Sequence, residues 1–322
     1  DLDAVTAFSN DGSNPEGAEL MLNDGTGQFS LGAIDTPFRR AGAATSVGGL
    51  TWVDANRDGR IDLWVGQGSV DSQPLSDRLF LQQDGGGFTD ATAQLGLETE
   101  DWTQAALNAG RAHTNAWSSA ACDLDNDGNP DLLAASYGRA PNKLFRGLDD
   151  GGFENVSVAS GYAFDHRQDW SDNESARCWC TLNPNDEDCA GVPAPSLIQC
   201  QSNADAFRWT HSRDREVWRL GGKSGTTVCG DVNNDGNLDL LTTEIVHWDV
   251  GASSDPSELL FNDGNSPPVF ERPGGEATGI SRSQGRTWDD GDITGALFDF
   301  DNDGRLDVYI GSTDYGLSLI HI

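Results

Sequence analysis

Basic residues are scarce in this sequence. Only 20 Lys and Arg stand against 52 Asp and Glu, which gives a formal net charge of −32. A protein that binds DNA or RNA needs a basic stripe for the phosphate backbone, and the sequence contains none. So acidic a surface also repels anionic membranes. We therefore expect no nucleic-acid partner.

Long apolar runs are missing as well. A membrane-spanning helix needs about 18 consecutive apolar residues, and no run approaches that length, so the chain is not expected to span a membrane. Hydrophobic residues make up only 36% of the chain. Disordered chains are poor in aromatics, however, and this one has 10 Trp and 13 Phe. Its short apolar runs are separated by glycines, which favours an all-β protein.

The sequence lacks the common catalytic motifs. It contains no G-x-S-x-G and no H-E-x-x-H segment. The segment "GGKSG" (221–225) resembles a phosphate-binding loop, but Val217 stands where the first glycine should be. His113 and His247 have no sequence partner for nucleophilic catalysis, and we expect them to cap loops or pack beside nearby tryptophans. We therefore predict no catalytic residues, although the many paired carboxylates leave a glycosidase site open.

Cysteines are few but even in number. Four of the six lie within 23 residues, which favours disulfides and an oxidising compartment. A zinc site is the alternative, but the cluster contains no histidine and its Cys-Trp-Cys spacing is unusual for zinc. Six cysteines allow 15 pairings, so the connectivity stays open. The six are Cys122, Cys178, Cys180, Cys189, Cys200 and Cys229.

One acidic segment occurs four times. Its copies read "DANRDGRIDLWVGQ", "DLDNDGNPDLLAAS", "DVNNDGNLDLLTTE" and "DFDNDGRLDVYIGS", and they begin at Asp54, Asp123, Asp231 and Asp299. Successive starts are 69, 108 and 68 residues apart. A remnant, "DLDAV", opens the chain, with Asp3 at the ninth position of the segment. Such self-similarity indicates a repeat architecture.

Two further blocks accompany each acidic segment. A small, β-prone block such as "GGLTWV" precedes it, and a block such as "RLFLQQDGGGF" follows. One unit thus reads strand, acidic loop, strand, polar loop, strand, glycine-rich turn, strand. Four strands in about 65 residues are the content of one propeller blade. We predict an all-β fold, a β-propeller of four-stranded blades, with roughly four to five blades in this chain.

The acidic loops predict metal binding. Counted from the first Asp, oxygen side chains fall at positions 1, 3, 5 and 9, glycine at 6, and a backbone carbonyl at 7 can join them. Hard oxygen ligands in a curled loop suit Ca²⁺ better than Mg²⁺, and no Cys or His favours zinc or copper. We expect about four sites, the two with Asn at position 3 binding more weakly. The candidate ligands are Asp54, Asn56, Asp58, Arg60 and Asp62; Asp123, Asp125, Asp127, Asn129 and Asp131; Asp231, Asn233, Asp235, Asn237 and Asp239; and Asp299, Asp301, Asp303, Arg305 and Asp307.

Taken together, these segments resemble the FG-GAP/VCBS repeat family, the calcium-binding propeller repeats also seen in integrin α-subunits. The tail "RLFLQQDGGGFTDATAQLGL" is similar to that of secreted bacterial VCBS proteins and of cartilage acidic protein. The resemblance covers most of residues 1–316, apart from a Cys-rich insertion at about 162–222. It implies a propeller, often of seven blades, on extracellular proteins that bind proteins or glycans, and it implies nothing catalytic.

Both ends of the sequence look cut, and we expect an internal fragment of a longer protein. The last six residues, "LSLIHI" (317–322), resemble a translated sequencing adapter and are left out of the fold prediction. The predicted function is a secreted or cell-surface, non-catalytic calcium-binding scaffold for adhesion or ligand recognition, with an extracellular protein or glycan as partner. The alternative is a propeller module of a secreted carbohydrate-active enzyme.

Overall fold

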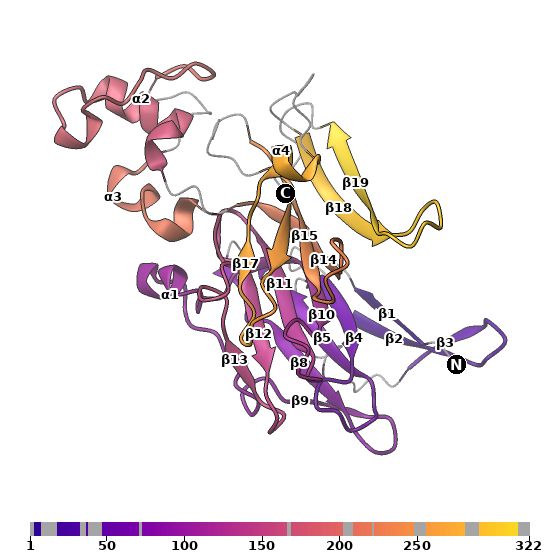
Figure 1. The fold of residues 1–322 in the computed structure, drawn as a ribbon. Helices are drawn as coiled ribbons and strands as arrows, with labels where there is room; N and C mark the ends of the chain where they lie inside the picture. The colour runs from indigo at the N-terminus through magenta and orange to yellow at the C-terminus, as the bar shows by residue number, and fades with distance from the viewer. Residues whose placement is uncertain are drawn as a thin grey trace.

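The computed structural model describes residues 3–7, 18–32, 37, 47–70, 73–165, 169–201, 209–220, 222–247, 256–280 and 290–314. Strands make up 38% of the structure and helices 13%. The strands form separate antiparallel sheets (Figure 1). The all-β prediction is therefore confirmed. The tail 317–322 lies outside the described residues.

Three sheets have four strands each, in the order in which the strands follow along the chain. Each is a meander of the predicted unit, with the acidic loop between its first two strands. The first sheet contains β4 (Val47–Val53), β5 (Asp62–Gln67), β8 (Arg78–Gln82) and β9 (Phe88–Asp90). The second contains β10 (Asn115–Cys122), β11 (Asp131–Tyr137), β12 (Lys143–Gly147) and β13 (Phe153–Asn155). The third contains β14 (Ser224–Gly230), β15 (Asp239–Glu244), β16 (Glu258–Asn262) and β17 (Phe270–Glu271).

Smaller sheets lie at the two ends of this series. The N-terminal sheet has three strands, β1 (Ala4–Ala7), β2 (Ala18–Asn23) and β3 (Phe29–Leu31). The fourth sheet has two in the described residues, β18 (Asp290–Phe298) and β19 (Asp307–Asp314), joined by the fourth acidic loop. A short hairpin, β6 (Ser69–Val70) and β7 (Gln73–Pro74), follows β5.

The first strands of successive sheets pack side by side, β4 against β10, β10 against β14 and β14 against β18. Small residues in these strands make the close approach possible. A Cβ atom on Gly49 would lie 2.2 Å from the backbone nitrogen of Ser119, so only glycine fits there. The Thr51 hydroxyl also donates to the Ser119 carbonyl across this contact (2.9 Å). The small, β-prone block of the sequence is thus the contact between neighbouring sheets.

Apolar side chains fill the space between neighbouring sheets. Trp64 of β5 is fully buried against Phe145 of the second sheet, and its indole N–H donates to the Leu133 carbonyl (2.9 Å). Leu133 lies in turn in the core between the second and third sheets, together with Leu240. Burial of such side chains contributes about 1.5–3 kcal/mol each. The interface between the first and second sheets and that between the second and third therefore each have their own apolar core.

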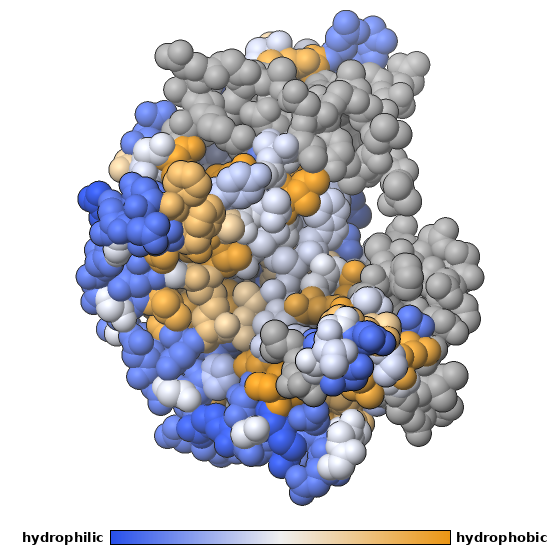
Figure 2. Space-filling model, turned by 90° about the vertical axis from the view of Figure 1, so that its right-hand side faces the viewer, coloured by the Kyte–Doolittle hydropathy of each residue, from blue (hydrophilic) through white to orange (hydrophobic). Residues whose placement is uncertain are grey.

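The fourth sheet leaves one apolar face open in the described residues. Tyr309 occupies in β19 the position that Trp64 occupies in β5, yet it is 56% exposed, because the described residues contain no following sheet. Phe298 at the end of β18 and Phe300 in the fourth acidic loop are exposed as well. Figure 2 views the molecule from this side and shows apolar residues gathered in the middle of the face, with hydrophilic residues along its left and lower borders.

All six cysteines are paired, which confirms the disulfide prediction. Cys122–Cys229 joins β10 to β14 and so links the second and third sheets. The other two disulfides, Cys178–Cys200 and Cys180–Cys189, lie within the insertion. These are the pairings that the sequence left open.

The insertion contains most of the helical structure. Its helices are η1 (Trp170–Asp172), α2 (Glu174–Leu182), η2 (Glu187–Cys189), α3 (His211–Asp214) and η3 (Val217–Leu220). Elsewhere lie α1 (Gln104–Asn108), which contacts η3, and α4 (Gly275–Thr278). None of the helices in the described part of the chain is long and apolar enough to cross a membrane.

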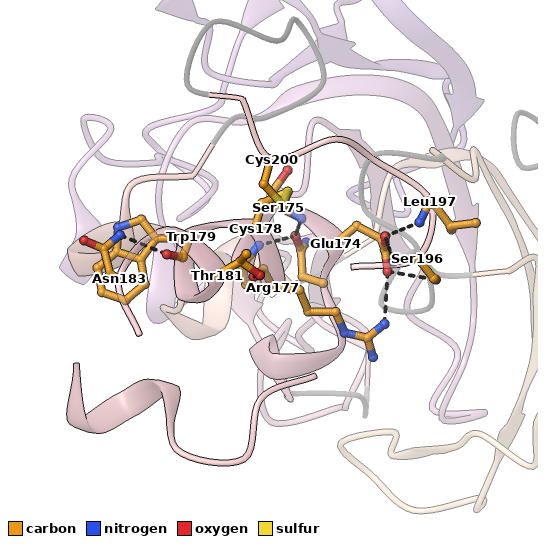
Figure 3. Close-up of a disulfide and its surroundings, with 12 residues drawn as sticks. Glu174, Ser175, Arg177, Cys178, Trp179, Thr181, Asn183, Ser196, Leu197 and Cys200 are labelled. Carbon is orange, nitrogen blue, oxygen red and sulfur yellow. Dashed lines mark hydrogen bonds and ion pairs between the residues drawn. A yellow bond between two sulfur atoms is a disulfide. The ribbon is translucent and has the colours of Figure 1, made fainter. Parts of the chain in front are cut away.

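Helix α2 is held by its cap and by a buried carboxylate (Figure 3). The Asn173 side chain accepts hydrogen bonds from the backbone N–H groups of Ser175 and Ala176, which satisfies the start of the helix. The buried Glu174 carboxylate accepts from the backbone N–H groups of Ser196 (2.8 Å) and Leu197 (2.6 Å). Together with Cys178–Cys200, these bonds fold segment 196–200 back onto α2.

Candidate metal centres

The four acidic loops share one hydrogen-bonding scheme. In the second loop, the Asp123 carboxylate accepts from the backbone N–H groups of Asp127 (3.1 Å) and Gly128 (3.0 Å). The first carboxylates of the other loops accept from their positions 5 and 6 at 2.9–3.0 Å. The repeated sequence therefore folds into a repeated geometry.

Two residues per loop have positive φ angles and make the bend possible. Glycine at position 6 was expected in this role, and Gly128 has φ of 85°. Position 4 was not expected to need it, yet Asn126 has φ of 56° and Arg57 has φ of 58°. Asn tolerates the left-handed region better than most residues, which explains its presence at this position in three of the four loops.

The aspartate at position 9 ties the loop to the sheet. Asp131 accepts from Leu124 N–H at position 2 (2.8 Å) and from Gly147 N–H at the end of β12 (2.9 Å). Asp62 and Asp239 make the same pair of bonds in the first and third loops. In the fourth loop, Asp307 accepts from Phe300 N–H (2.8 Å).

The pKa of Asp131 is raised to about 7, mainly by burial and to a smaller extent by the nearby Asp125 and Asp127 carboxylates, against two backbone N–H groups that lower it. Burial likewise raises the pKa of Asp62 and Asp239. Burial, assisted by the neighbouring carboxylates, thus favours the protonated form of these position-9 aspartates in the absence of a cation. A divalent cation would reverse this preference.

Two of the loops bring three carboxylates together, with ligand atoms within 4.8 Å of one another. These groups are Asp123, Asp125 and Asp127, and Asp299, Asp301 and Asp307. Each could hold a metal ion. The backbone carbonyls of Arg60, Asn129, Asn237 and Arg305 stay predicted ligands, and the arginine side chains of the first and fourth loops instead pair with Asp58 and Asp303.

The first and third loops have asparagine at position 3. Asn56 donates from its side-chain nitrogen to the Asp58 carboxylate (2.8 Å), and Asn233 donates in the same way to Asp235 (2.9 Å). These loops contain one carboxylate fewer than the second and fourth loops, and the asparagine amide donates a hydrogen bond to the carboxylate at position 5. Their arrangement agrees with the expectation of weaker binding, which stays a prediction.

The second loop offers the clearest fit to a hard cation. The Asp125 side chain is fully buried, and its Oδ1 atom has no hydrogen-bond partner. Burying a carboxylate oxygen without a partner is costly. Its neighbours are the carboxylates of Asp123 and Asp127, so the donor set is all oxygen, as calcium prefers.

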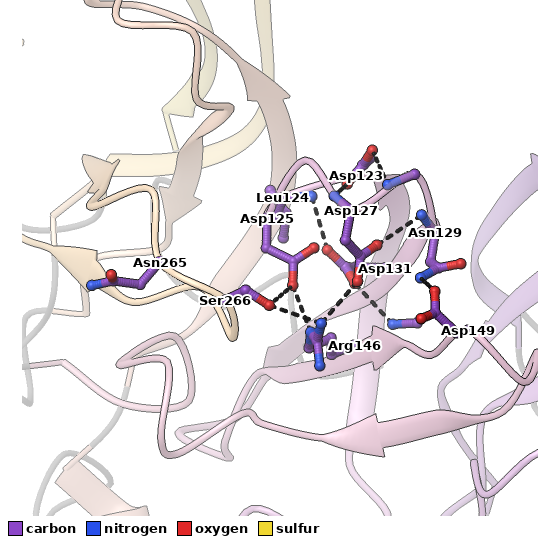
Figure 4. A network of polar contacts seen from close by, with 12 residues as sticks. Asp123, Leu124, Asp125, Asp127, Asn129, Asp131, Arg146, Asp149, Asn265 and Ser266 are labelled. Carbon is purple, nitrogen blue, oxygen red and sulfur yellow. Dashed lines mark hydrogen bonds and ion pairs between the residues drawn. The ribbon is translucent and has the colours of Figure 1, made fainter.

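Sequence reasoning missed two residues at this loop. Arg146 on β12 reaches Asp125 (2.5 Å) and Asp127 (2.8 Å) through its guanidinium. Ser266, from the loop between β16 and β17 of the next sheet, donates to Asp125 Oδ2 (2.7 Å). Figure 4 shows both side chains directed at the acidic group. Arg146 was detectable in principle, since the equivalent residues of β8 and β16 are the apolar Leu81 and Phe261.

A third acidic group lies in the insertion, where none was predicted. It contains Asp186, Asp188 and His211. His211 contacts the Asp188 carboxylate through Nε2 (3.1 Å), and Arg215 pairs with the same carboxylate. The hydrogen bond to His211 is the main cause of the lowered pKa of Asp188. Contacts with His211 and Arg215 thus already satisfy this aspartate.

The residues considered for catalysis lie apart from the acidic loops. His113 contacts the Thr99 hydroxyl through Nδ1, and burial lowers the pKa of His113. His247 lies 3.5 Å from the Tyr137 hydroxyl, and Trp117 stacks on the Tyr137 ring.

Comparisons with protein-family models and with curated proteins give no match for this chain.

Proposed function

We propose that this chain is a non-catalytic, calcium-binding β-propeller of the FG-GAP/VCBS type, with a structural ion in each acidic loop. The observation that carries the proposal is one oxygen-lined geometry repeated in four loops. In every copy the first carboxylate accepts from the N–H groups of positions 5 and 6, so the same oxygen-bearing side chains are held on one curled loop four times. The sheets pack in series through their first strands, as blades do around an axis.

In the second loop, calcium would be held by Asp123, Asp125 and Asp127, with the Asn129 carbonyl as a further ligand. The ion would supply positive charge to a group of carboxylates that otherwise repel one another. Other residues of the loop position these ligands. Asp131 clamps the loop to β12, and Gly128 lets the backbone turn so that alternate side chains converge.

The proposed role of the scaffold is recognition of an extracellular protein or glycan at a secreted or cell-surface location. Three disulfides support an oxidising compartment. The test is to present the calcium-loaded protein to glycan and matrix-protein arrays and to analyse every bound glycan for cleavage. Binding without turnover supports a recognition module, whereas turnover would favour the carbohydrate-active enzyme.

The calcium role has its own test in hydrogen–deuterium exchange. Peptides covering 54–62, 123–131, 231–239 and 299–307 should exchange more slowly in calcium than in EDTA, because each ion fixes the backbone of its loop. Equal exchange under both conditions in all four peptides would contradict the proposal.

A further inference from the structure

Arg146 stands at a position that is apolar in the neighbouring sheets. The strand pairings Leu63 to Phe80, Leu132 to Phe145 and Leu240 to Leu260 align the third strands of the three sheets. The next residue is Leu81 in the first sheet, Arg146 in the second and Phe261 in the third. Of these three third strands, that of the second sheet alone has an arginine at this position.

The guanidinium of Arg146 makes the contacts expected of a bound cation. Its Nε donates to Asp125 Oδ2 (2.5 Å), and its Nη2 donates to Asp127 Oδ2 (2.8 Å). Its side chain is 18% exposed, and that of Asp125 is fully buried. The arginines of the first and fourth loops are 36% and 75% exposed, so their ion pairs are more strongly screened by water.

Ser266 connects this pair to the third sheet. Arg146 Nη2 donates to the Ser266 hydroxyl (2.8 Å), and that hydroxyl donates to Asp125 Oδ2 (2.7 Å). The three side chains close a ring of hydrogen bonds between the two sheets (Figure 4). Any cation that enters the loop has to share Asp125 with this ring.

We propose that Arg146 is an internal counter-cation of the second acidic loop and that a calcium ion takes its place when it binds. The inference rests on the proposed calcium function and adds its regulation. Without metal, the guanidinium neutralises Asp125 and Asp127 and keeps the loop in its binding geometry. When calcium binds these carboxylates, repulsion between the two cations displaces the guanidinium and opens its bond to Ser266. Calcium at this loop therefore changes the contact between the second and third sheets.

The exchange also changes the expected order of affinities. The second loop has four carboxylates, at Asp123, Asp125, Asp127 and Asp131, and the third has only three. Counting ligands alone makes the second loop the tighter site. Four carboxylates less one guanidinium leave a formal charge of −3, the same as the third loop. The advantage of the second loop is thus cancelled while Arg146 stays in place.

The test is calorimetric titration of the full chain with calcium after chelation, together with thermal melts before and after loading. Arg146→Leu installs the kind of residue that stands in the first sheet. It should leave the number of sites unchanged, tighten one class of site roughly tenfold, and lower the melting temperature of the calcium-free protein. Arg146→Lys keeps the charge and should stay close to wild type in affinity. Asp125→Asn should remove or strongly weaken the same class of site.

Arg78→Leu is the matched control, since Arg78 forms an ion pair with Asp90 on the first sheet (2.8 Å). It should leave every calcium affinity unchanged. The exchange is wrong if Arg146→Leu binds calcium with wild-type or weaker affinity, or if Asp125→Asn leaves the titration unaltered. If the wild-type protein itself takes up no calcium, the proposed function fails, which is a different result. Should Arg146→Leu be unfolded without metal, refolding on calcium addition would support the exchange, and failure to refold would count against it.

Discussion

The repeated sheets and the cysteine-rich insertion are ordered by different means. In the sheets, acidic loops hold strand ends together, and a single disulfide, Cys122–Cys229, joins two neighbouring sheets. In the insertion, two disulfides lie within 23 residues around α2, and short helices replace strands. The sheets should therefore depend on the divalent cation, and the insertion on oxidising conditions.

The largest mutational effect should come from the disulfide between sheets. The double change Cys122→Ala and Cys229→Ala frees a loop of 107 residues, which should cost about 4–5 kcal/mol by the chain-entropy argument. The double change Cys180→Ala and Cys189→Ala frees only 9 residues and should cost about 2–3 kcal/mol. Urea denaturation in saturating calcium would measure both. Equal losses would show that the two regions do not differ as described.

The next largest loss of stability should come from the contacts between the first strands of neighbouring sheets. Gly49→Ala would place a Cβ atom 2.2 Å from the Ser119 backbone, so β4 has to move away from β10 at a cost of about 1–3 kcal/mol. Gly87→Ala is the control, because a Cβ atom there meets nothing within 4 Å. Denaturation midpoints of the two variants should differ clearly. Similar midpoints would mean that the sheets are not closely packed at this contact.

The acidic loops differ in their number of carboxylates, and Asn56→Asp tests whether that number sets the calcium affinity. The change adds a carboxylate at position 3 of the first loop and removes the amide that satisfies Asp58. Calcium affinity of one site should rise by roughly tenfold, as expected for one more charged ligand. Calorimetric titration would show it. An unchanged affinity would indicate that position 3 does not face the ion.

A smaller change in stability should come from a change of pH. Burial raises the pKa of Glu244 at the end of β15 to about 8, from an ordinary value near 4.5. The folded protein then binds a proton that the unfolded chain has lost, so stability is highest below about pH 4.5 and falls as pH rises to about 8.

Glu244→Gln keeps an acceptor for the Ser224 hydroxyl, which now donates to Glu244 Oε1 (2.6 Å), and it cannot ionise. Relative to wild type, this variant should gain about 1 kcal/mol or more of stability between pH 5.5 and pH 8.5. Denaturation in saturating calcium at both pH values is the measurement. A difference independent of pH would show that Glu244 does not titrate in this range.

Much of this architecture follows from local sequence, because its determinants are local. Four copies of the acidic segment predicted the loops, and glycine at position 6 predicted their bend, as Gly128 shows. Contacts between distant segments could not be predicted in the same way. Cys122 meets Cys229 across two sheets, and Ser266 reaches Asp125 from 141 residues away. Helix α2 was missed as well, although Asn173 before it is a common helix-capping residue.

The central claim is that calcium holds the acidic loops together, and a calcium titration of the chelated protein with a thermal melt at each point tests it most directly. At a free concentration ten times Kd, each site should contribute ~1.4 kcal/mol, and four sites should contribute ~5–6 kcal/mol. That is comparable to the whole stability of an ordinary domain. We expect about four sites and a large rise in melting temperature. A melting temperature that stays the same in EDTA and in calcium would contradict the account.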